Sequence, residues 1–498
     1  MAVKAGWLVV LDAGTGGLHA AIFDLDGRIA GHTATDWPIV ESEDDLLTRE
    51  FDPERTWAAV AQAIRQALRR ADVSPAEVRA IAATSQRDGC VLLDGEGREL
   101  CCTLNRDARG VVHADEISGE FGEKVFRTTG RWPLGLGPLG HLWWFRHNRP
   151  RTYRQIAHIL MIRDWLTYRM SGALLSEPTG ASSSLLFDVR ERKWAVDLAE
   201  EMGFPTSIFP PCVEPGTVAG PLLPPAAADL GLPEGVPVVV GPADSQAAAL
   251  GCGVLAEGKA VVIAGTTMPV MMVLDRPHFD PSHRLYTGAH ALPGQWVLES
   301  NAGLAGAVYD WFARAFAGPD PDYERLEEEA AAAYPGEVLA SVGPAIADFS
   351  TLRIPPPTVF RFPFLGMMEE PPTRGAFARA ILENIGFAAK ANLEQLEEAA
   401  GRKAESLHLC GGLARSSLLA RIVADICERP VHVPVVREAS WLGAAACAAV
   451  GIGAYPDLPS AVRAIVRHEP PVEPGPASRR YRRLYAHWRD LLEKSYDL

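Results

Sequence analysis

The stretch WLVVLDAGTGGLHAAIFDLD, residues 7–26, decides the fold and the first candidate site. Trp7 to Leu11 is a short apolar run with β-branched side chains, which predicts a buried strand. A second apolar run, Leu18 to Phe23, follows the glycine-rich segment Ala13 to Gly17. Strand, glycine turn and strand predict a β-hairpin in which the glycines supply positive φ angles.

The turn of this hairpin has the composition of a phosphate-binding loop. Because Gly14 and Gly16 carry no side chain, the backbone N–H groups can approach an anion closely, and Thr15 adds a hydroxyl donor. Asp12 would repel a phosphate directly, but it can hold Mg²⁺ or its water ligands beside one. An ordinary surface hairpin is the alternative, since a motif as short as D-x-G-T also occurs by chance.

A second stretch repeats this pattern about 250 residues later. Lys259 to Ala264 is mostly apolar, Gly265 to Thr267 follow, and a further apolar run ends at Leu274. Pro269 in that run predicts an edge strand or a bulge, because proline cannot donate to a central ladder. Two such hairpins predict two related halves, each of which gives one phosphate loop to a shared cleft.

Composition and charge argue against several classes of partner. With 498 residues, the chain is long enough for two or more domains with their own cores. The net charge of −14 argues against nucleic acid or an anionic membrane surface as the main partner. We recognise neither a secretory leader nor a long apolar run, so we expect a cytoplasmic protein. The eight cysteines include no C-x-x-C pair, which argues against disulfides and a zinc site.

Strands alternate with helices along the chain, which predicts an α/β protein. Asp52 is expected to cap a helix, and a tail helix from Ala477 to Leu492 is expected to dock on the body through an aromatic face. Polar loops follow three of the predicted strands: Gln86 to Gly89, Asn105 to Arg109, and Gly241 to Gln246. Polar residues just past buried strand ends often line a cleft in α/β proteins, although a solvated loop is the alternative.

Together these residues resemble the FGGY family of carbohydrate kinases, from Leu8 to about Tyr455. The resemblance rests on segments in the family's order, which are Asp12 to Thr15, the Asp107/Arg109 loop, Gly241 to Asp244, Gly265 to Thr267, Gly411–Gly412 with Ala424–Asp425, and EASWLGAA at 438–445. It implies an α/β fold of two actin-like, ribonuclease-H-like domains around an interdomain cleft for ATP and substrate. The expected division is residues 1–248, 249–455 and a tail helix in 456–498.

The resemblance also implies a role for each matched residue. Asp244 would be the catalytic base of an ATP- and Mg²⁺-dependent kinase that phosphorylates a hydroxyl of a small sugar-like substrate. Substrate binding would fall to Arg87, Asp88, Asn105, Asp107, Arg109 and Gln246. The ATP phosphates would contact Gly14, Thr15, Gly16, Gly265, Thr266 and Thr267, adenosine would contact Gly411, Gly412 and Arg415, and Mg²⁺ would bind through water at Asp12 and Asp244. The expected partners are a small carbohydrate and ATP, with no nucleic acid and no membrane, and a homodimer is one assembly that the resemblance allows.

Within the family, the sequence is most similar to autoinducer-2 kinases, for example at Glu50 to Asp52 and at Asn105, where sugar kinases often carry Trp. This similarity implies 4,5-dihydroxy-2,3-pentanedione, the linear autoinducer-2 precursor, as substrate. A xylulokinase-like pentulose or polyol kinase is the alternative. A non-catalytic sugar-sensing ATP-binding protein is another, because His19 replaces an Arg that is usual in the family and Leu413 replaces a third glycine.

Overall fold

The computed structural model describes residues 6–40, 46–350, 356–363 and 370–497. They form two compact units, of which unit 1 comprises residues 1–255, 274–297 and 438–466, and unit 2 comprises 256–273, 298–437 and 467–498. The first border lies near the expected division at residue 248. Two later segments, 274–297 and 438–466, nevertheless group with unit 1. Within the described residues, no helix has both the length and the apolar character that crossing a membrane requires.

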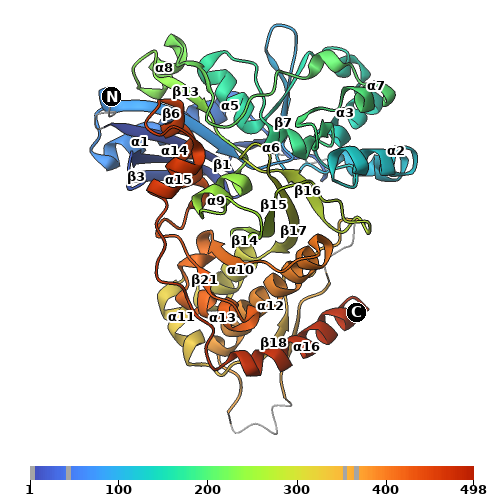
Figure 1. The fold of residues 1–498 in the computed structure, drawn as a ribbon, viewed down its shortest axis with the longest axis vertical. Coiled ribbons are helices and arrows are strands. Elements are labelled where there is room, and N and C mark those ends of the chain that lie inside the picture. Colours follow the sequence, from blue (N-terminus) through green and yellow to red (C-terminus); the bar gives the residue numbers. More distant parts are fainter. Residues whose placement is uncertain (1–5, 41–45, 351–355, 364–369, 498) are drawn as a thin grey trace. The chain divides into compact units, whose positions relative to one another are not determined.

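The main sheet of unit 1 has the strand order β12-β13-β6-β1-β2-β3 (Figure 1). Its strands are β1 (Trp7–Gly14), β2 (Gly17–Asp24), β3 (Ile29–Thr35), β6 (Val78–Ser85), β12 (Val218–Pro221) and β13 (Pro237–Val240). β1 and β2 form the predicted antiparallel hairpin, with Asp12 opposite His19. β6 runs parallel to β1 and also to β13, so the carboxyl ends of these three strands meet at one edge of the sheet.

The glycines of the first hairpin do not have the expected backbone conformation. Gly14, Gly16 and Gly17 are absent from the positive-φ glycines of the described chain, so that prediction was wrong. Gly14 and Gly17 face each other at the end of the ladder. A Cβ on Gly17 would lie only 3.0 Å from the carbonyl oxygen of Thr35. The close approach of β3, and not the turn itself, therefore explains the glycine at position 17.

Helices cover both faces of this sheet. On one face, α1 (Pro53–Ala71), α5 (Ile162–Ser171) and α8 (Pro224–Leu230) share an apolar core with Val9, Leu11 and Ala13 of β1. The predicted cap of α1 is confirmed, because Asp52 accepts the backbone N–H of Arg55 at 2.8 Å. On the other face lie α9 (Asp244–Gly251) and α14 (Ala439–Gly451), the latter packed on β1, β6 and β13. A Cβ on Gly443 would overlap the carbonyl group of Ala247, so glycine permits the close crossing of these two helices.

A second layer of unit 1 surrounds a small sheet of order β8-β7-β9. Its elements are β7 (Cys90–Leu93), β8 (Glu99–Cys102), β9 (His158–Met161), α2 (Ala114–Thr129), α3 (Gly137–Asn148), α4 (Pro150–Tyr153), α6 (Pro178–Ala181) and α7 (Val196–Glu201). The short pairs β4 (Ile39–Val40) with β5 (Glu50–Phe51) and β10 (Phe187–Asp188) with β11 (Lys193–Trp194), and the helix α15 (Leu458–Ile465), complete the unit.

The second large sheet has the order β16-β17-β15-β14-β20-β21, and most of it belongs to unit 2. Its strands are β14 (Lys259–Ile263), β15 (Thr267–Leu274), β16 (Tyr286–Ala289), β17 (Trp296–Leu304), β20 (Ser406–Cys410) and β21 (Val431–His432). As in the first sheet, an antiparallel hairpin, β14–β15, is followed by parallel strands, β20 and β21. This repeated plan confirms the predicted α/β class. Pro269, in contrast, lies in an interior strand, and the ladder with β14 runs from Val270, so the edge prediction was wrong.

The helices of unit 2 include the predicted tail helix. They are α10 (Gly306–Ala317), α11 (Tyr323–Ala332), α12 (Arg374–Ala400), α13 (Ser417–Cys427) and α16 (Ser478–Ser495), with a short pair of strands, β18 (Leu339–Ser341) and β19 (Val359–Arg361). The Tyr481 hydroxyl donates to Glu383 at 2.8 Å, and Trp488 Nε1 donates to Asn384 Oδ1 at 2.7 Å. These bonds to α12 confirm that α16 docks through its aromatic face.

Candidate active site

The parallel strands of unit 1 bring three candidate residues to one edge of the sheet. Asp12 lies near the end of β1, Arg87 follows β6, and Asp244 is the first residue of α9 after β13. Burial raises the pKa of Asp244 to about 6, an effect that Arg87 opposes and Asp12 increases. Ser245 donates its backbone N–H at 2.6 Å and its hydroxyl at 3.0 Å to Oδ1 of Asp244. Two carboxylates and one guanidinium therefore influence one another at the strand ends.

Helix α14 holds the carboxylate of Asp12. The Ser440 hydroxyl and Trp441 Nε1 donate to its Oδ2 at 2.8 and 3.0 Å. Oδ1 is buried and has no hydrogen-bond partner among the described residues. Burial raises the pKa of Asp12 to about 6, while the two bonds to α14 oppose this rise. Sequence reasoning noted the EASWLGAA segment but gave Ser440 and Trp441 no role, because nothing local connects residue 441 with residue 12.

The unpartnered oxygen of Asp12 fits an expected magnesium site. Among the described residues, no group of three or more His, Cys, Asp or Glu side chains gathers as a metal site. Kinases hold Mg²⁺ through one or two carboxylates, with substrate phosphates and water as the other ligands, so Asp12 alone is compatible with that role. A Cβ on Gly14 would lie 3.6 Å from Oδ1. A side chain at position 14 would therefore contact this oxygen.

His19 lies opposite Asp12 in the β1–β2 ladder and packs against Trp441. Its ring centre is 5.4 Å from that of Trp441, which also packs against His32 at 5.5 Å. Burial lowers the pKa of His19, with a further decrease from His32, while Glu438 opposes both. His19 is therefore neutral near pH 7, and its position carries no fixed cation.

Two threonines anchor the loop that carries Asp244. The Thr84 hydroxyl donates to the carbonyl oxygen of Pro242 at 2.7 Å. Thr179 accepts the backbone N–H of Ala243 at 2.7 Å and donates its own hydroxyl to Glu177 at 2.5 Å. Glu177 is fully buried and is paired with Arg163 at 2.5 Å. Sequence reasoning assigned none of these residues a role, and the only signal was the small, polar composition of the loop around Thr179.

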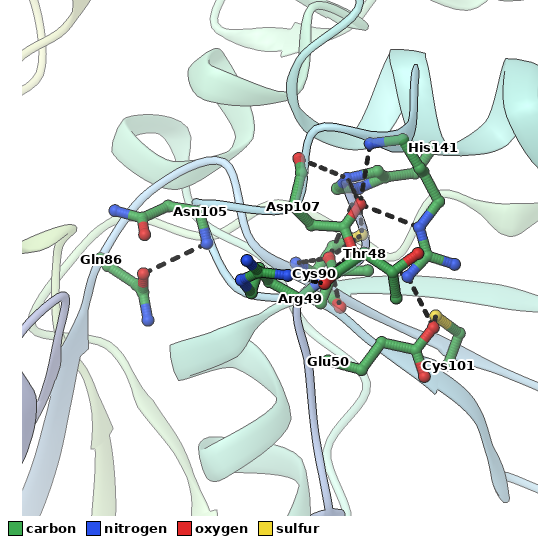
Figure 2. A network of polar contacts seen from close by, with 11 residues as sticks. Thr48, Arg49, Glu50, Gln86, Cys90, Cys101, Asn105, Asp107 and His141 are labelled. Carbon is green, nitrogen blue, oxygen red and sulfur yellow. Dashed lines mark hydrogen bonds and ion pairs between the residues drawn. The ribbon is translucent and has the colours of Figure 1, made fainter. Parts of the chain in front are cut away.

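Asp107 and Arg109 form the centre of a buried polar network (Figure 2). Arg109 donates to both oxygens of Asp107, at 2.8 and 2.7 Å, and to Glu50 at 2.6 Å. Asp107 also accepts the backbone N–H of Arg49 at 2.8 Å, and it lies 3.3 Å from Nε2 of His141. Although burial acts in the opposite direction, His141 and Arg109 hold the pKa of Asp107 well below its usual range. Both side chains are thus already engaged by protein partners. That Asp107 and Arg109 contact substrate stays a prediction.

Asn105 connects this network with the first phosphate loop. Its Nδ2 donates to the Thr15 hydroxyl at 2.7 Å. Its backbone N–H donates to Oε1 of Gln86 at 3.2 Å, a contact that Figure 2 shows. Each of the three polar loops predicted to line a cleft has one buried side-chain atom without a partner among the described residues. These atoms are Asn105 Oδ1, Gln86 Nε2 and Gln246 Oε1. Buried polar groups are almost always hydrogen-bonded, so these atoms mark places where a polar ligand can bind.

Asp88 has an unusual backbone conformation for a non-glycine residue. Its φ is 67°, in the left-handed region. Its backbone N–H donates to the Ser183 hydroxyl at 3.3 Å, and its carboxylate accepts from Arg131 at 3.1 Å. Residues held in such conformations concentrate at functional sites, which agrees with the predicted role of Asp88 in binding substrate.

In unit 2, the two predicted nucleotide segments follow neighbouring parallel strands. Gly265 to Thr267 follow β14, and Gly411 and Gly412 follow β20, so both segments lie at the same sheet edge. Gly411 has a φ of 90°, and a Cβ there would lie 2.7 Å from the carbonyl carbon of Ala264. A Cβ on Gly412 would meet nothing within 4 Å. Arg415 ends the short 3₁₀ helix that begins at Gly412, and its side chain is exposed.

Comparison with known proteins agrees with this arrangement. The family model of the N-terminal domain of FGGY carbohydrate kinases matches residues 7–251, and that of the C-terminal domain matches residues 260–452. The chain belongs to the FGGY family of carbohydrate kinases. It is an ATP-dependent phosphotransferase with a hydroxyl group as acceptor.

Among similar FGGY kinases, an autoinducer-2 kinase from Yersinia enterocolitica is 34% identical over 480 residues, which cover 94% of this chain and 90% of the relative. One from Salmonella typhimurium is 32% identical over 483 residues, with 94% and 91% covered. The crystal structure of a gluconate kinase from Lactobacillus acidophilus matches with a TM-score of 0.84, 18% identity and 99% of both chains covered. At that identity the structural match supports the FGGY fold alone.

Proposed function

We propose that this kinase phosphorylates the primary hydroxyl of 4,5-dihydroxy-2,3-pentanedione, with Asp244 as the general base. The observation that carries the catalytic part is the position of Asp244 at the strand-end edge, beside Arg87 and Asp12. The substrate is supported by the similarity to autoinducer-2 kinases at 32–34% identity. Asn105 adds to this support, because its unpartnered amide oxygen suits a compact, oxygen-rich ligand.

The role of Asp244 follows from the chemistry of alcohol phosphorylation. A hydroxyl is a poor nucleophile until its proton has an acceptor, and a carboxylate within reach can take that proton as phosphate transfer proceeds. The two bonds from Ser245 fix the carboxylate, so it needs little reorganisation when substrate binds. Anchoring of Pro242 and Ala243 by Thr84 and Thr179 fixes the backbone next to it.

Each unit carries a loop that is suited to the phosphates of ATP. We assign its phosphates to the turn at Thr15 and to the loop at Thr266, whose backbone N–H groups and hydroxyls are suited to anions. Gly412 would allow adenosine close to the backbone, since no described atom occupies that space. Mg²⁺ bound at Asp12 through water would offset the charge that develops on the transferred phosphate.

The test of the catalytic role is Asp244→Asn, with Asp229→Asn as control. Asp229 accepts from Trp57 Nε1 at 2.8 Å in the same unit, so its substitution also removes a charge from a hydrogen-bonded carboxylate. We expect Asp244→Asn to lower kcat by about two to four decades while ATP still binds, because it removes the general base. The control should keep near-normal turnover. Turnover by Asp244→Asn at the level of the control would refute the assignment.

The substrate is tested separately by ADP release. We expect kcat/KM for 4,5-dihydroxy-2,3-pentanedione to exceed that for D-xylulose in one enzyme preparation. The opposite ranking would make the protein a xylulokinase-like enzyme and would leave the role of Asp244 unchanged.

A further inference from the structure

Two consecutive residues of α14 hold one oxygen of Asp12 and leave the other without a donor. The Ser440 hydroxyl and Trp441 Nε1 both donate to Oδ2, at 2.8 and 3.0 Å. Oδ1 is buried and accepts no hydrogen bond from any described residue. Because both donors bind the same oxygen, they fix the plane of the carboxylate and determine which way the second oxygen points.

Trp441 is itself held in place, so its N–H has a fixed direction. Its side chain is 6% exposed, and its ring centre lies 5.4 Å from that of His19 and 5.5 Å from that of His32. Helix α14, which carries both donors, packs on β1, the strand that carries Asp12. Donors and acceptor therefore belong to elements that are packed together, which pre-organises the carboxylate.

The two donors stabilise a buried negative charge without cancelling it. A hydroxyl and an indole N–H are neutral, whereas the guanidinium of Arg109 engages both oxygens of Asp107 and neutralises that carboxylate. At the strand ends, Asp244 is influenced by both Arg87 and Asp12. Two carboxylates thus share one guanidinium, and these three groups carry a net negative charge when all are ionised. Such a group favours the binding of a cation.

The open oxygen of Asp12 lies beside the turn that we assign to the phosphates of ATP. A Cβ on Gly14 would lie 3.6 Å from Oδ1. Buried polar atoms almost always have a hydrogen-bond partner, and Mg²⁺ usually keeps several water ligands, whose O–H groups are donors. A hydrated cation at this place would give Oδ1 the donor that the described residues do not supply.

We propose that Ser440 and Trp441 are positioning residues for the metal: by binding Oδ2 they turn Oδ1 of Asp12 toward hydrated Mg²⁺ and set the affinity for the metal–nucleotide complex. This inference rests on the proposed kinase function and deepens it, because it explains how a single carboxylate serves as the protein's part of a metal site. Hydrogen-bond partners of metal-binding side chains commonly determine metal affinity in this way.

The test measures how much Mn²⁺, which takes the same oxygen ligands as Mg²⁺, strengthens the binding of ADP. Calorimetry gives the Kd of ADP in EDTA and with saturating Mn²⁺, and the ratio of the two is the contribution of the metal. Trp441→Phe keeps an aromatic ring and removes the N–H, and Ser440→Ala removes the hydroxyl. We expect each to lower the ratio by about tenfold, the lower end of the loss for such partners. Ser440→Thr, which keeps the hydroxyl, should restore it.

Trp57→Phe is the matched control. Trp57 is 5% exposed, and its Nε1 donates to the carboxylate of Asp229 at 2.8 Å. It belongs to α1, which covers the other face of the sheet. The substitution removes the same kind of buried bond away from Asp12 and should leave the ratio unchanged. The affinity for ADP in EDTA should change by less than about threefold in all variants, because none of them removes a nucleotide contact.

An unchanged ratio in Trp441→Phe and Ser440→Ala overturns the inference, and so does an equal loss of affinity in EDTA, which would show that the turn and not the metal is affected. A wild-type ratio near one also overturns it, since there would then be no metal to position. If one variant does not fold, the other decides. These measurements need no turnover, so failure of the proposed function, seen as no ADP release with any hydroxyl substrate, is distinguished from failure of this inference.

Discussion

Replacing Thr179 by valine should slow catalysis without a direct contact with any reacting group. The substitution keeps the shape of the side chain and removes a hydroxyl that accepts from Ala243 N–H and donates to buried Glu177. Leaving the buried N–H of Ala243 unpaired costs about 1–3 kcal/mol, which we expect as a decrease in the free energy of unfolding. The residue next to Ala243 is Asp244, so the loss of this anchor also allows the carboxylate to move.

The effect on rate follows from the precision that proton transfer needs. A displacement of about 1 Å at a reacting group costs about 100-fold, so we expect kcat to fall by about 10- to 100-fold. The KM for ATP should change little, because the hydroxyl of Thr179 bonds to Ala243 and Glu177, neither of which we assign to ATP. Steady-state ADP release and urea unfolding measure the two quantities on one preparation.

Thr167→Val is the matched control for this experiment. Thr167 is also buried, and its hydroxyl donates at 2.9 Å to the carbonyl oxygen of Arg163 within its own helix. It should lose a similar or smaller amount of stability and keep its kcat. If Thr179→Val retains as much activity as Thr167→Val, the anchor has no influence on the position of Asp244 and the reasoning is refuted.

Two further predictions concern single positions. Gly411→Ala should lower the free energy of unfolding by about 1–3 kcal/mol, because Gly411 has a positive φ and lies against the Ala264 carbonyl. Gly412→Ala should keep the stability of the protein and weaken ATP binding measured by calorimetry. Equal unfolding midpoints for the two variants would contradict this prediction. Burial lowers the pKa of His290 from 6.5 to about 4, so the unfolded chain binds a proton that the folded chain does not, and unfolding free energy should fall by about 1.4 kcal/mol per unit as pH drops through that window. His290→Asn, which can still accept the Leu292 N–H, should flatten that dependence in urea titrations, and an unchanged slope would show that other groups cause it.

The fold was predictable where local patterns dominate. The hairpin at Asp12, the cap at Asp52 and the face of α16 each follow from residues within a few positions of one another. The positive φ expected for the turn glycines was wrong, since the close approach of Thr35 on β3 explains Gly17. The edge strand expected at Pro269 was wrong because β15 lies inside its sheet, which depends on pairing with distant strands.

The candidate site was predictable to the same extent. Arg87, Asp88 and Asp244 each follow a buried strand, and parallel pairing brings such ends together. The contacts of Trp441 with Asp12 and of Tyr286 with Arg131 could not be found in this way. Trp441 follows Asp12 by 429 positions, and both Trp441 and Tyr286 lie in later segments of the chain that group with unit 1 only in the folded structure.

The network of Asp107 and Arg109 is better explained as a support than as a contact surface. A substrate hydroxyl that bound Asp107 would have to displace one of its donors, Arg109 or the N–H of Arg49. Breaking a buried ion pair costs about 3–5 kcal/mol, whereas a hydrogen bond to a charged group contributes about 1.5–3 kcal/mol. The exchange is therefore unfavourable, and the network instead fixes the loop that presents Asn105 to Thr15. By this argument we predict that Asn105 contacts the substrate and that Asp107 and Arg109 determine where its amide lies.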